Sequence, residues 1–510
     1  MDLFRKAADR NHAPSQFYLS FTLMAEGSAD PAPAAQKAAA YLKRAAGQSY
    51  TPALLALGYQ KLYGVGCAVD VDGALALYKR AFRLREQRTK LLSYLAPTEE
   101  LRLTEQNAQA FRNAIERDLG AEERQTKDAI RYWEPKAAEG DGLAMYELAK
   151  LMEDNPDAEE AVAQLYQRAS EKGVVAAMRD VGLCYMHGIG VPLNAEKAVQ
   201  HLAAAVEQGD HEAAKFLGYI YYTGVERPQE GKPVKRDDEL AAKYFWQAAK
   251  QEIPEAMYFV GELLSKRGKG VIGMRPQQQM QNAYSMYRSA ADYGLTQAMV
   301  REAEMLEKGI GVRRNLNRAA LLYKALAENS FAVHTLTQSL YAYVENDYVA
   351  SFVHNALAAF VGVQAGQFNV GQLYVNGRGM HRLDNARRLA RSSLSQGYVE
   401  GDVTALRLLG RLAEQEGQRE VASELYTKGF TGGDLECIDP LIALFAADRR
   451  AWTKAIHLLQ YKQYRRARNT DGAPPGVRRT LEGLSTWCKI NQLKARRAIT
   501  RFVFRDSQDS

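Results

Sequence analysis

A recurring Gly-x-Gly turn is a motif in this chain that could do chemistry, because glycine-rich turns can hold the phosphates of a nucleotide. Turns of this kind begin at residues 64, 188, 309 and 377. A dinucleotide fingerprint needs a third glycine three residues after the second one, where these four turns have Val69, Leu193, Arg314 and Arg382. Each pair also joins two helix-like segments, and no Gly-x4-Gly-Lys-Ser/Thr loop occurs. These glycine pairs therefore predict turns between helices and do not predict a nucleotide-binding site.

The histidines and cysteines do not form a catalytic or metal-binding set. His211-Glu212 is followed by Lys215 where a zinc-protease helix needs its second histidine. Cys184 and His187 lie one turn apart, but no further metal ligand is near them in sequence. The four cysteines are more than 50 residues apart, which indicates neither a zinc ribbon nor a disulfide scaffold. We expect no enzyme, no metal and no cofactor.

The composition indicates a folded chain, and the length is too great for a single ordinary hydrophobic core. The 510 residues are 46% hydrophobic and 25% charged, with a net charge of +7 that is small for this length. The longest apolar runs, such as residues 356–363, are far shorter than the roughly 18 residues of a membrane span. We therefore expect no membrane span, and the charge alone does not predict nucleic-acid binding.

An internal repeat is the strongest pattern in the sequence. Ala177 is followed by an apolar–glycine pair at Val181-Gly182 and by glycines at 188 and 190. From Ala177 onward, successive copies, weak ones included, begin 32 to 43 residues apart, which is the length of a helical repeat. Apart from this copy, whole or partial copies begin at Ala53, Ala213, Ala256, Ala298 and Gly366, and weaker ones near Ala13, Ala144, Ala332, Ala405 and Cys437.

Each copy is expected to form a pair of antiparallel helices. Apolar residues recur every three or four positions, and no alternation is long enough for a sheet. The second helix ends in small residues and a glycine, as at Gly140, Gly173 and Gly294, which suits a left-handed C-cap. A glycine within the first helix costs about 1 kcal/mol relative to alanine, and close approach of the paired helix would compensate. The sequence thus predicts an all-α fold, a right-handed α-solenoid of stacked helix pairs.

The complete motif, Ala-x3-Leu-Gly-x2-Tyr-x2-Gly-x-Gly-Val with a closing Ala-Ala-x2-Gly, resembles the Sel-one-like repeat of the tetratricopeptide-like class. Lys197-Ala198 and Glu239-Leu240-Ala241 match the start of its second helix. The resemblance covers most of residues 1–450 and is strongest at 177–209. It implies a scaffold or adaptor whose first helices line a concave groove for proteins or peptides. Relatives with two cysteines per repeat are secreted, and the lack of that pattern here favours a reducing compartment.

The repeat frame divides the chain into four parts. We expect N-terminal repeats at 1–82, a main array at 129–450 and a basic helical cap at 451–510. Residues 83–128 lose the frame, although Leu84–Leu119 has the pattern of an amphipathic helix interrupted at Pro97. Either an inserted helical arm or two decayed repeat helices would account for this part.

The resemblance also predicts which side chains face the groove. Tyrosine and arginine are the side chains that most often supply binding energy at protein interfaces, although each could equally serve ordinary packing between repeats. The terminal-carboxylate clamp of tetratricopeptide domains is not reproduced. The predicted groove residues are Tyr59, Tyr63, Arg179, Lys215, Tyr219, Tyr222, Tyr258 and Phe368.

The carboxyl end is strongly basic, with 15 Lys+Arg against 4 Asp+Glu in residues 449–510. This segment could dock on nucleic acid, anionic lipid or an acidic protein. Alternatively, it could be a solvated helix that closes the solenoid, with Leu481, Leu484, Trp487 and Ile490 turned inward. The arginines that would contact an anionic partner are Arg465, Arg466, Arg468, Arg478, Arg479, Arg496 and Arg497.

Three functions fit these observations: a non-enzymatic adaptor, a bacterial envelope assembly factor in polysaccharide or peptidoglycan export, and a protein that binds anionic surfaces through its basic end. The envelope role requires export. Residues 2–9 look like the second half of a repeat that lacks its first helix. If Met1 is internal to a longer reading frame, the location could be periplasmic. If residues 2–9 are a capping helix, we expect a cytoplasmic protein.

Overall fold

A computed structural model describes residues 2–26, 31–86, 94–96, 101–116, 119–226, 228–266, 275–378, 384–399, 401–448, 451, 453–459 and 461. The chain forms two compact units. Unit 1 comprises Met1–Tyr41, Thr98–Ala108 and Phe331–Ser510, and unit 2 comprises Leu42–Pro97 and Gln109–Ser330.

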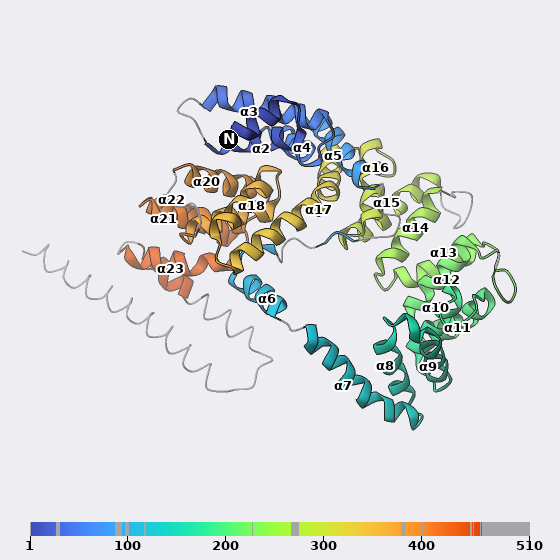
Figure 1. The fold of residues 1–510 in the computed structure, drawn as a ribbon. Helices are drawn as coiled ribbons and strands as arrows, with labels where there is room; N and C mark the ends of the chain where they lie inside the picture. Colours follow the sequence, from blue (N-terminus) through green and yellow to red (C-terminus); the bar gives the residue numbers. More distant parts are fainter. Residues whose placement is uncertain are drawn as a thin grey trace, which may run out of the picture. The chain divides into compact units, whose positions relative to one another are not determined.

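Helices are the only regular elements in the described ranges, apart from two isolated β-bridges. Figure 1 labels most of them along the chain. Short 3-10 helices, among them Pro156–Ala158 and Leu435–Cys437, accompany them. The α-helices are α1 Asp2–Asp9, α2 Ala13–Glu26, α3 Pro31–Gly47, α4 Thr51–Tyr63, α5 Val71–Glu86, α6 Glu105–Glu116, α7 Leu119–Ala138, α8 Gly142–Met152, α9 Glu159–Glu171, α10 Val175–His187, α11 Ala195–Glu207, α12 His211–Thr223, α13 Asp238–Ala249, α14 Pro254–Lys266, α15 Pro276–Asp292, α16 Thr296–Lys308, α17 Leu316–Val344, α18 Tyr348–Phe360, α19 Gln364–Val375, α20 Asp384–Val399, α21 Thr404–Gln415, α22 Arg419–Thr431 and α23 Ile438–Ala447.

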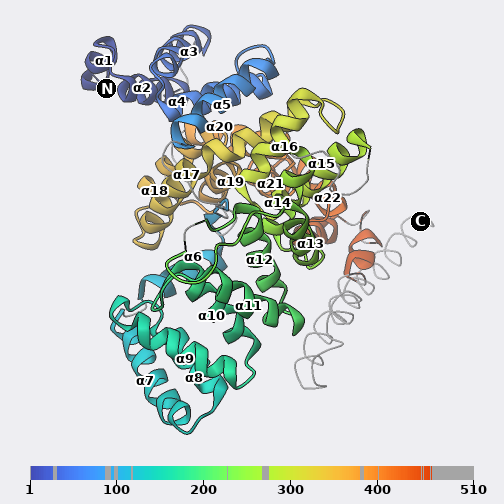
Figure 2. The same ribbon diagram turned by 90° about the vertical axis from the view of Figure 1, so that its right-hand side faces the viewer.

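Helix pairs stack in chain order within each unit. In unit 2, α8 packs on α9, α10 on α11, α12 on α13 and α14 on α15, and each pair contacts the next one (Figure 2). In unit 1, α18 packs on α19, α19 on α20 and α21 on α22. The prediction of an all-α solenoid of antiparallel helix pairs is confirmed.

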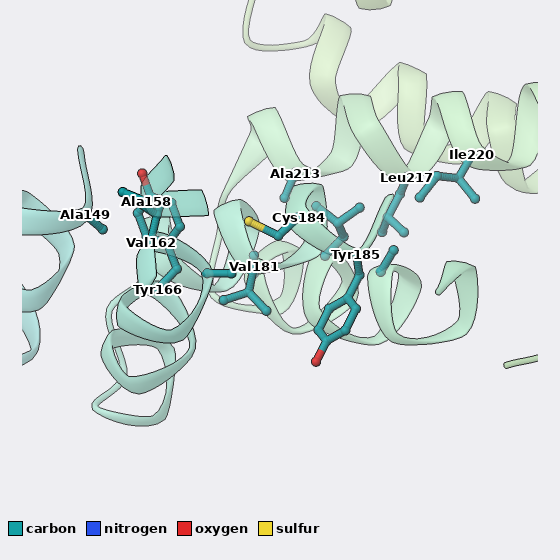
Figure 3. Close-up of a cluster of buried hydrophobic side chains, with 14 residues drawn as sticks. Ala149, Ala158, Val162, Tyr166, Val181, Cys184, Tyr185, Ala213, Leu217 and Ile220 are labelled. Atoms are coloured by element: carbon teal, nitrogen blue, oxygen red, sulfur yellow. The ribbon is translucent and has the colours of Figure 1, made fainter. Parts of the chain in front are cut away.

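The glycine inside the first helix of a pair leaves room for a large side chain from the second helix. A Cβ built on Gly218 of α12 would lie 2.7 Å from the Phe245 ring of α13, and one on Gly261 would lie 2.7 Å from the Tyr287 ring. Buried alanines complete this contact between paired helices, which we call the seam. An example is the cluster that joins α9 to α12 (Figure 3). The predicted close approach is therefore present, and a bulky side chain causes it. Gly58, Gly182, Gly371 and Gly410 likewise face Tyr78, Leu202, Leu394 and Tyr426.

A methyl group at one of these seams should destabilise the array. We expect Gly218→Ala to lower the free energy of unfolding by about 2 kcal/mol, because overpacking of a core outweighs the roughly 1 kcal/mol gain in helix propensity. Gly47→Ala is the control, since a Cβ there meets nothing within 4 Å, and it should be neutral or slightly stabilising. Denaturant unfolding measures both. Equal effects of the two substitutions would contradict this account of the seam.

The turns between paired helices use left-handed glycines. Gly188 and Gly190 have φ values of 70° and 64°, a conformation that a side chain strains. A Cβ on Gly190 would also collide with the backbone oxygen of Glu159, at the start of α9. The turn after α10 therefore rests on the preceding pair. The glycines predicted to end second helices, Gly140, Gly173 and Gly294, have φ of 97°, 86° and 83°.

Two local expectations were wrong. Residues 94–96 and 102–104 do not continue an amphipathic helix, because Ala96 and Leu103 donate their backbone amides to Asn329 and Asn369, which are distant in the chain. No turn separates two helices at the weak copy near Ala332, where α17 runs unbroken through a segment without glycine or proline. Within the described ranges, no helix combines the length and the apolar character of a membrane span.

Candidate partner-binding surface

A cluster of aromatic side chains lies on two successive first helices of unit 2, α12 and α14. The ring of Phe259 lies 5.8 Å from Tyr219, 5.2 Å from Tyr222 and 5.4 Å from Tyr258, measured between centroids. Tyr219 is 39% exposed, and the other three are half-buried. Three of the predicted groove residues thus meet around one phenylalanine that the sequence analysis did not select.

An arginine held by two aspartates extends this cluster to α10, so that a row of side chains runs along successive first helices. Arg179 donates from Nε to Asp180 Oδ1 at 3.0 Å and from Nη1 to Asp210 Oδ2 at 3.0 Å. Asp210 is also the N-cap of α12, where its other oxygen accepts from the Ala213 amide at 3.0 Å. Burial alone would lower the pKa of Arg179, but the two carboxylates raise it. One aspartate therefore caps a helix and fixes the arginine of the preceding pair.

A similar pairing holds the next first helix. Arg301 of α16 donates from Nε to Glu262 of α14 at 2.9 Å, and the same oxygen accepts from the Tyr287 hydroxyl at 2.9 Å. The Glu262 side chain is almost completely buried, and Arg301 is one third exposed. Burial and the charge of Glu262 raise the pKa of Tyr258.

Of the remaining predicted groove residues, Lys215 lies on α12 itself, whereas Tyr59 and Tyr63 lie on α4 and Phe368 lies on α19. Lys215 forms an ion pair with Glu212 on α12 at 2.5 Å. Tyr59 is buried, and its ring lies 5.2 Å from that of Tyr63 on α4. Phe368 of α19 is also buried, under the guanidinium of Arg102. The structure therefore groups Arg179, Tyr219, Tyr222 and Tyr258 along α10–α14, near Lys215, and does not bring Tyr59, Tyr63 or Phe368 to that row.

The sequence analysis missed a buried amide next to Phe368. Asn369 is fully buried in α19, and its carboxamide pairs with the backbone of residues 101 and 103. Asn369 is a polar residue two positions before the repeat glycine Gly371, in a helix that is otherwise almost wholly buried. This position is the signal that could have drawn attention to Asn369.

Two observations on the described part of the chain concern metal ligands and thiols. No three His, Cys, Asp or Glu side chains there are placed to hold a metal ion. Burial raises the pKa of Cys184 to about 11 and that of Cys437 to about 12, which disfavours reactive thiolates. The seven arginines of the basic end lie outside the described residues.

The repeat family model for the Sel1 repeat matches seven segments that together cover just over half of the chain. Six of them correspond to helix pairs predicted from the Ala/Gly motif, and the first begins at the weak copy near Ala13. The matched segments are residues 13–50, 51–85, 175–210, 211–252, 254–294, 296–331 and 364–398.

Several curated proteins are similar to parts of the chain. Chitin synthase regulatory factor 2 of Schizosaccharomyces pombe is 30% identical over 190 residues, which are 35% of this chain and 35% of that protein. DAP3-binding cell death enhancer 1 of Rattus norvegicus is 30% identical over 167 residues, 33% of this chain and 30% of that protein. The chain thus matches about a third of the length of these relatives.

Two solved structures are similar to the chain at low identity. A protective antigen of uropathogenic Escherichia coli with an SLR fold is 17% identical, with a TM-score of 0.33 over 96% of this chain and 90% of that one. A Sel1 repeat protein from Oxalobacter formigenes is 23% identical, with a TM-score of 0.34 over 66% of this chain and 90% of that one.

Proposed function

Because the chain belongs to the Sel1 repeat family, we propose that it is a non-enzymatic adaptor that binds a partner protein along the first helices α10–α16 of unit 2. The observation that carries this proposal is the aromatic cluster around Phe259, continued by Arg179 and Arg301 on the neighbouring first helices. Aromatic and arginine side chains dominate the energetics of protein interfaces.

The rigidity of this row supports the same role. Asp210 and Glu262 each fix an arginine from a neighbouring first helix, so the side chains lose little conformational entropy when a partner binds. The names of two relatives point in the same direction, since one is called a regulatory factor of chitin synthase and the other is called DAP3-binding. These names describe those proteins. For this chain, the proposed partner is a protein surface.

Removal of three side chains should abolish partner binding without unfolding the array. We expect Arg179→Ala, Tyr219→Ala and Tyr222→Ala together to weaken binding at least 100-fold, because each lost anchor costs about 1–2 kcal/mol. Quantitative affinity capture followed by titration with the recovered partner measures the change.

The control is Tyr341→Ala, which removes a tyrosine of similar exposure, 43%, from α17. It should leave the affinity within twofold of the unmodified chain. Equal recovery of partners by the triple variant and by this control would reject the assigned surface. Circular dichroism of each variant establishes that helix content is unchanged.

A further inference from the structure

A short segment of unit 1, Leu101–Thr104, lies against α19 as a bound peptide would. The segment bends in a tight turn, in which the Thr104 amide donates to the Arg102 oxygen at 2.8 Å. The carboxamide of Asn369 donates from Nδ2 to the Leu101 oxygen at 3.0 Å and accepts from the Leu103 amide at Oδ1 at 2.7 Å. These are the two backbone groups that flank Arg102. One side-chain amide thus pairs with the segment as a neighbouring β-strand would, and this pairing depends on the backbone and not on the sequence.

A buried network fixes the orientation of this carboxamide. Asn369 Nδ2 also donates to Asn355 Oδ1 on α18 at 2.9 Å, and Asn355 Nδ2 donates to the Ser351 oxygen at 2.9 Å. Both asparagines are fully buried. Because Asn355 fixes which end of the Asn369 amide is the donor, the site is preorganised to accept one backbone direction.

The side chain held between the two backbone contacts enters a pocket suited to arginine. Arg102 contacts Asp402 Oδ2 at 3.2 Å from Nη2 and donates from Nη1 to Thr404 Oγ1 at 3.0 Å. Its guanidinium carbon lies 4.9 Å from the centroid of the Phe368 ring. The side chains of Arg102 and Asp402 are only 12% and 5% exposed. The pocket therefore recognises the planar, permanently charged guanidinium of an arginine above an aromatic ring. Lysine reproduces this geometry poorly.

The residue after the arginine is also enclosed. Leu103 is 1% exposed, whereas Leu101 on the other side is partly exposed. An apolar residue is therefore required after the arginine and tolerated before it. The backbone, the arginine and the following leucine together define an apolar–Arg–apolar recognition pattern.

We propose that this face of α19 and α21 is a binding site for a short peptide with an arginine between two apolar residues, and that Leu101–Thr104 is its intramolecular occupant. An external peptide of this kind must displace the occupant to bind. The site lies in unit 1, on residues other than those of the α10–α16 surface, so it does not depend on the proposed function.

Self-occupancy makes the site autoinhibited. A tethered segment competes at an effective concentration of about 1 mM, so an external peptide of micromolar affinity has its apparent affinity reduced by the fraction of open sites. Release of the segment would open the site.

Fluorescence anisotropy with a labelled peptide of residues 98–107 tests this. We expect the full-length chain to bind it at least tenfold more tightly after Arg102→Ala and Leu103→Ser, which vacate the site. Addition of Asp402→Asn and Asn369→Leu should abolish that binding, and a peptide with glutamate in place of the arginine should not bind. Equal affinity of the unmodified and vacated chains, or binding that survives the loss of Asp402 and Asn369, would overturn the proposal.

A second measurement uses the unmodified chain, so the test does not rely on the folding of a variant. Hydrogen exchange of the Leu103 amide should be slow in the protein alone and at least tenfold faster with millimolar peptide, because the peptide replaces the segment on Asn369. Exchange that millimolar peptide leaves unchanged would also contradict the proposal.

Discussion

Arg318→Met is expected to lower the free energy of unfolding by about 3 kcal/mol, because it leaves a buried carboxylate without its cation. Glu302 of α16 is completely buried, and Arg318 of α17 donates to its Oε1 at 2.7 Å. The Tyr284 hydroxyl lies farther from that oxygen, at 3.5 Å. The hydrogen bond to Glu302 also raises the pKa of Arg318, as expected of a stabilised ion pair.

The repeat itself supplies the compensating change. Glu302 occupies the apolar position of the motif, where other first helices have Val181, Leu217 and Val260. We therefore expect Glu302→Leu added to Arg318→Met to restore most of the lost stability, since apolar replacements of buried ion pairs are often neutral or stabilising. Denaturant unfolding of the single and double variants measures this coupling.

An exposed pair provides the matched control. Arg131 and Asp128 lie 3.5 Å apart with side chains 79% and 74% exposed, so Arg131→Met should change stability by less than about 0.5 kcal/mol. A double variant as unstable as Arg318→Met alone would show that the loss comes from packing of the arginine and not from the stranded carboxylate.

Asn355→Leu should cost about 2–4 kcal/mol, the second large effect, because it strands several buried polar groups. Ser339 Oγ lies 3.0 Å from Ser351 Oγ, and both contact Asn355 in the core between α17 and α18. The substitution also removes the acceptor that orients Asn369. We therefore expect the Leu103 amide to exchange faster in this variant as well.

Asn376→Leu is the control for this substitution, since Asn376 is exposed at the end of α19. Its effect on stability should be within about 0.5 kcal/mol. A stability loss at Asn355 without any change in exchange at Leu103 would mean that the network supports the core but does not hold the segment.

The helix pairs could be predicted from sequence because their determinants are local and repeated. Gly218 and Gly261 recur at the position where a ring from the second helix packs, and Gly188 and Gly190 mark the turn that follows. Each signal lies within one repeat length of its partner. The continuous α17 escaped prediction because a missing turn has no positive signature, only the absence of glycine and proline.

The candidate sites were predictable only in part. Tyr219, Tyr222 and Tyr258 were selected from the family resemblance, but it does not show that they meet at Phe259. The role of Asn369 depends on Leu103, 266 residues away in the chain. No local pattern encodes such a contact, and the apolar character of residues 84–119 pointed to a helix instead.

Photo-crosslinking tests the central claim, that first helices of unit 2 carry the partner surface, most directly. A photoreactive phenylalanine analogue replaces Tyr219 in one variant and Tyr341 in another, two tyrosines of similar exposure at 39% and 43%. The account predicts a covalent adduct with the partner from position 219 and none from position 341. Adducts of equal yield from both positions, or an adduct from position 341 alone, would contradict it.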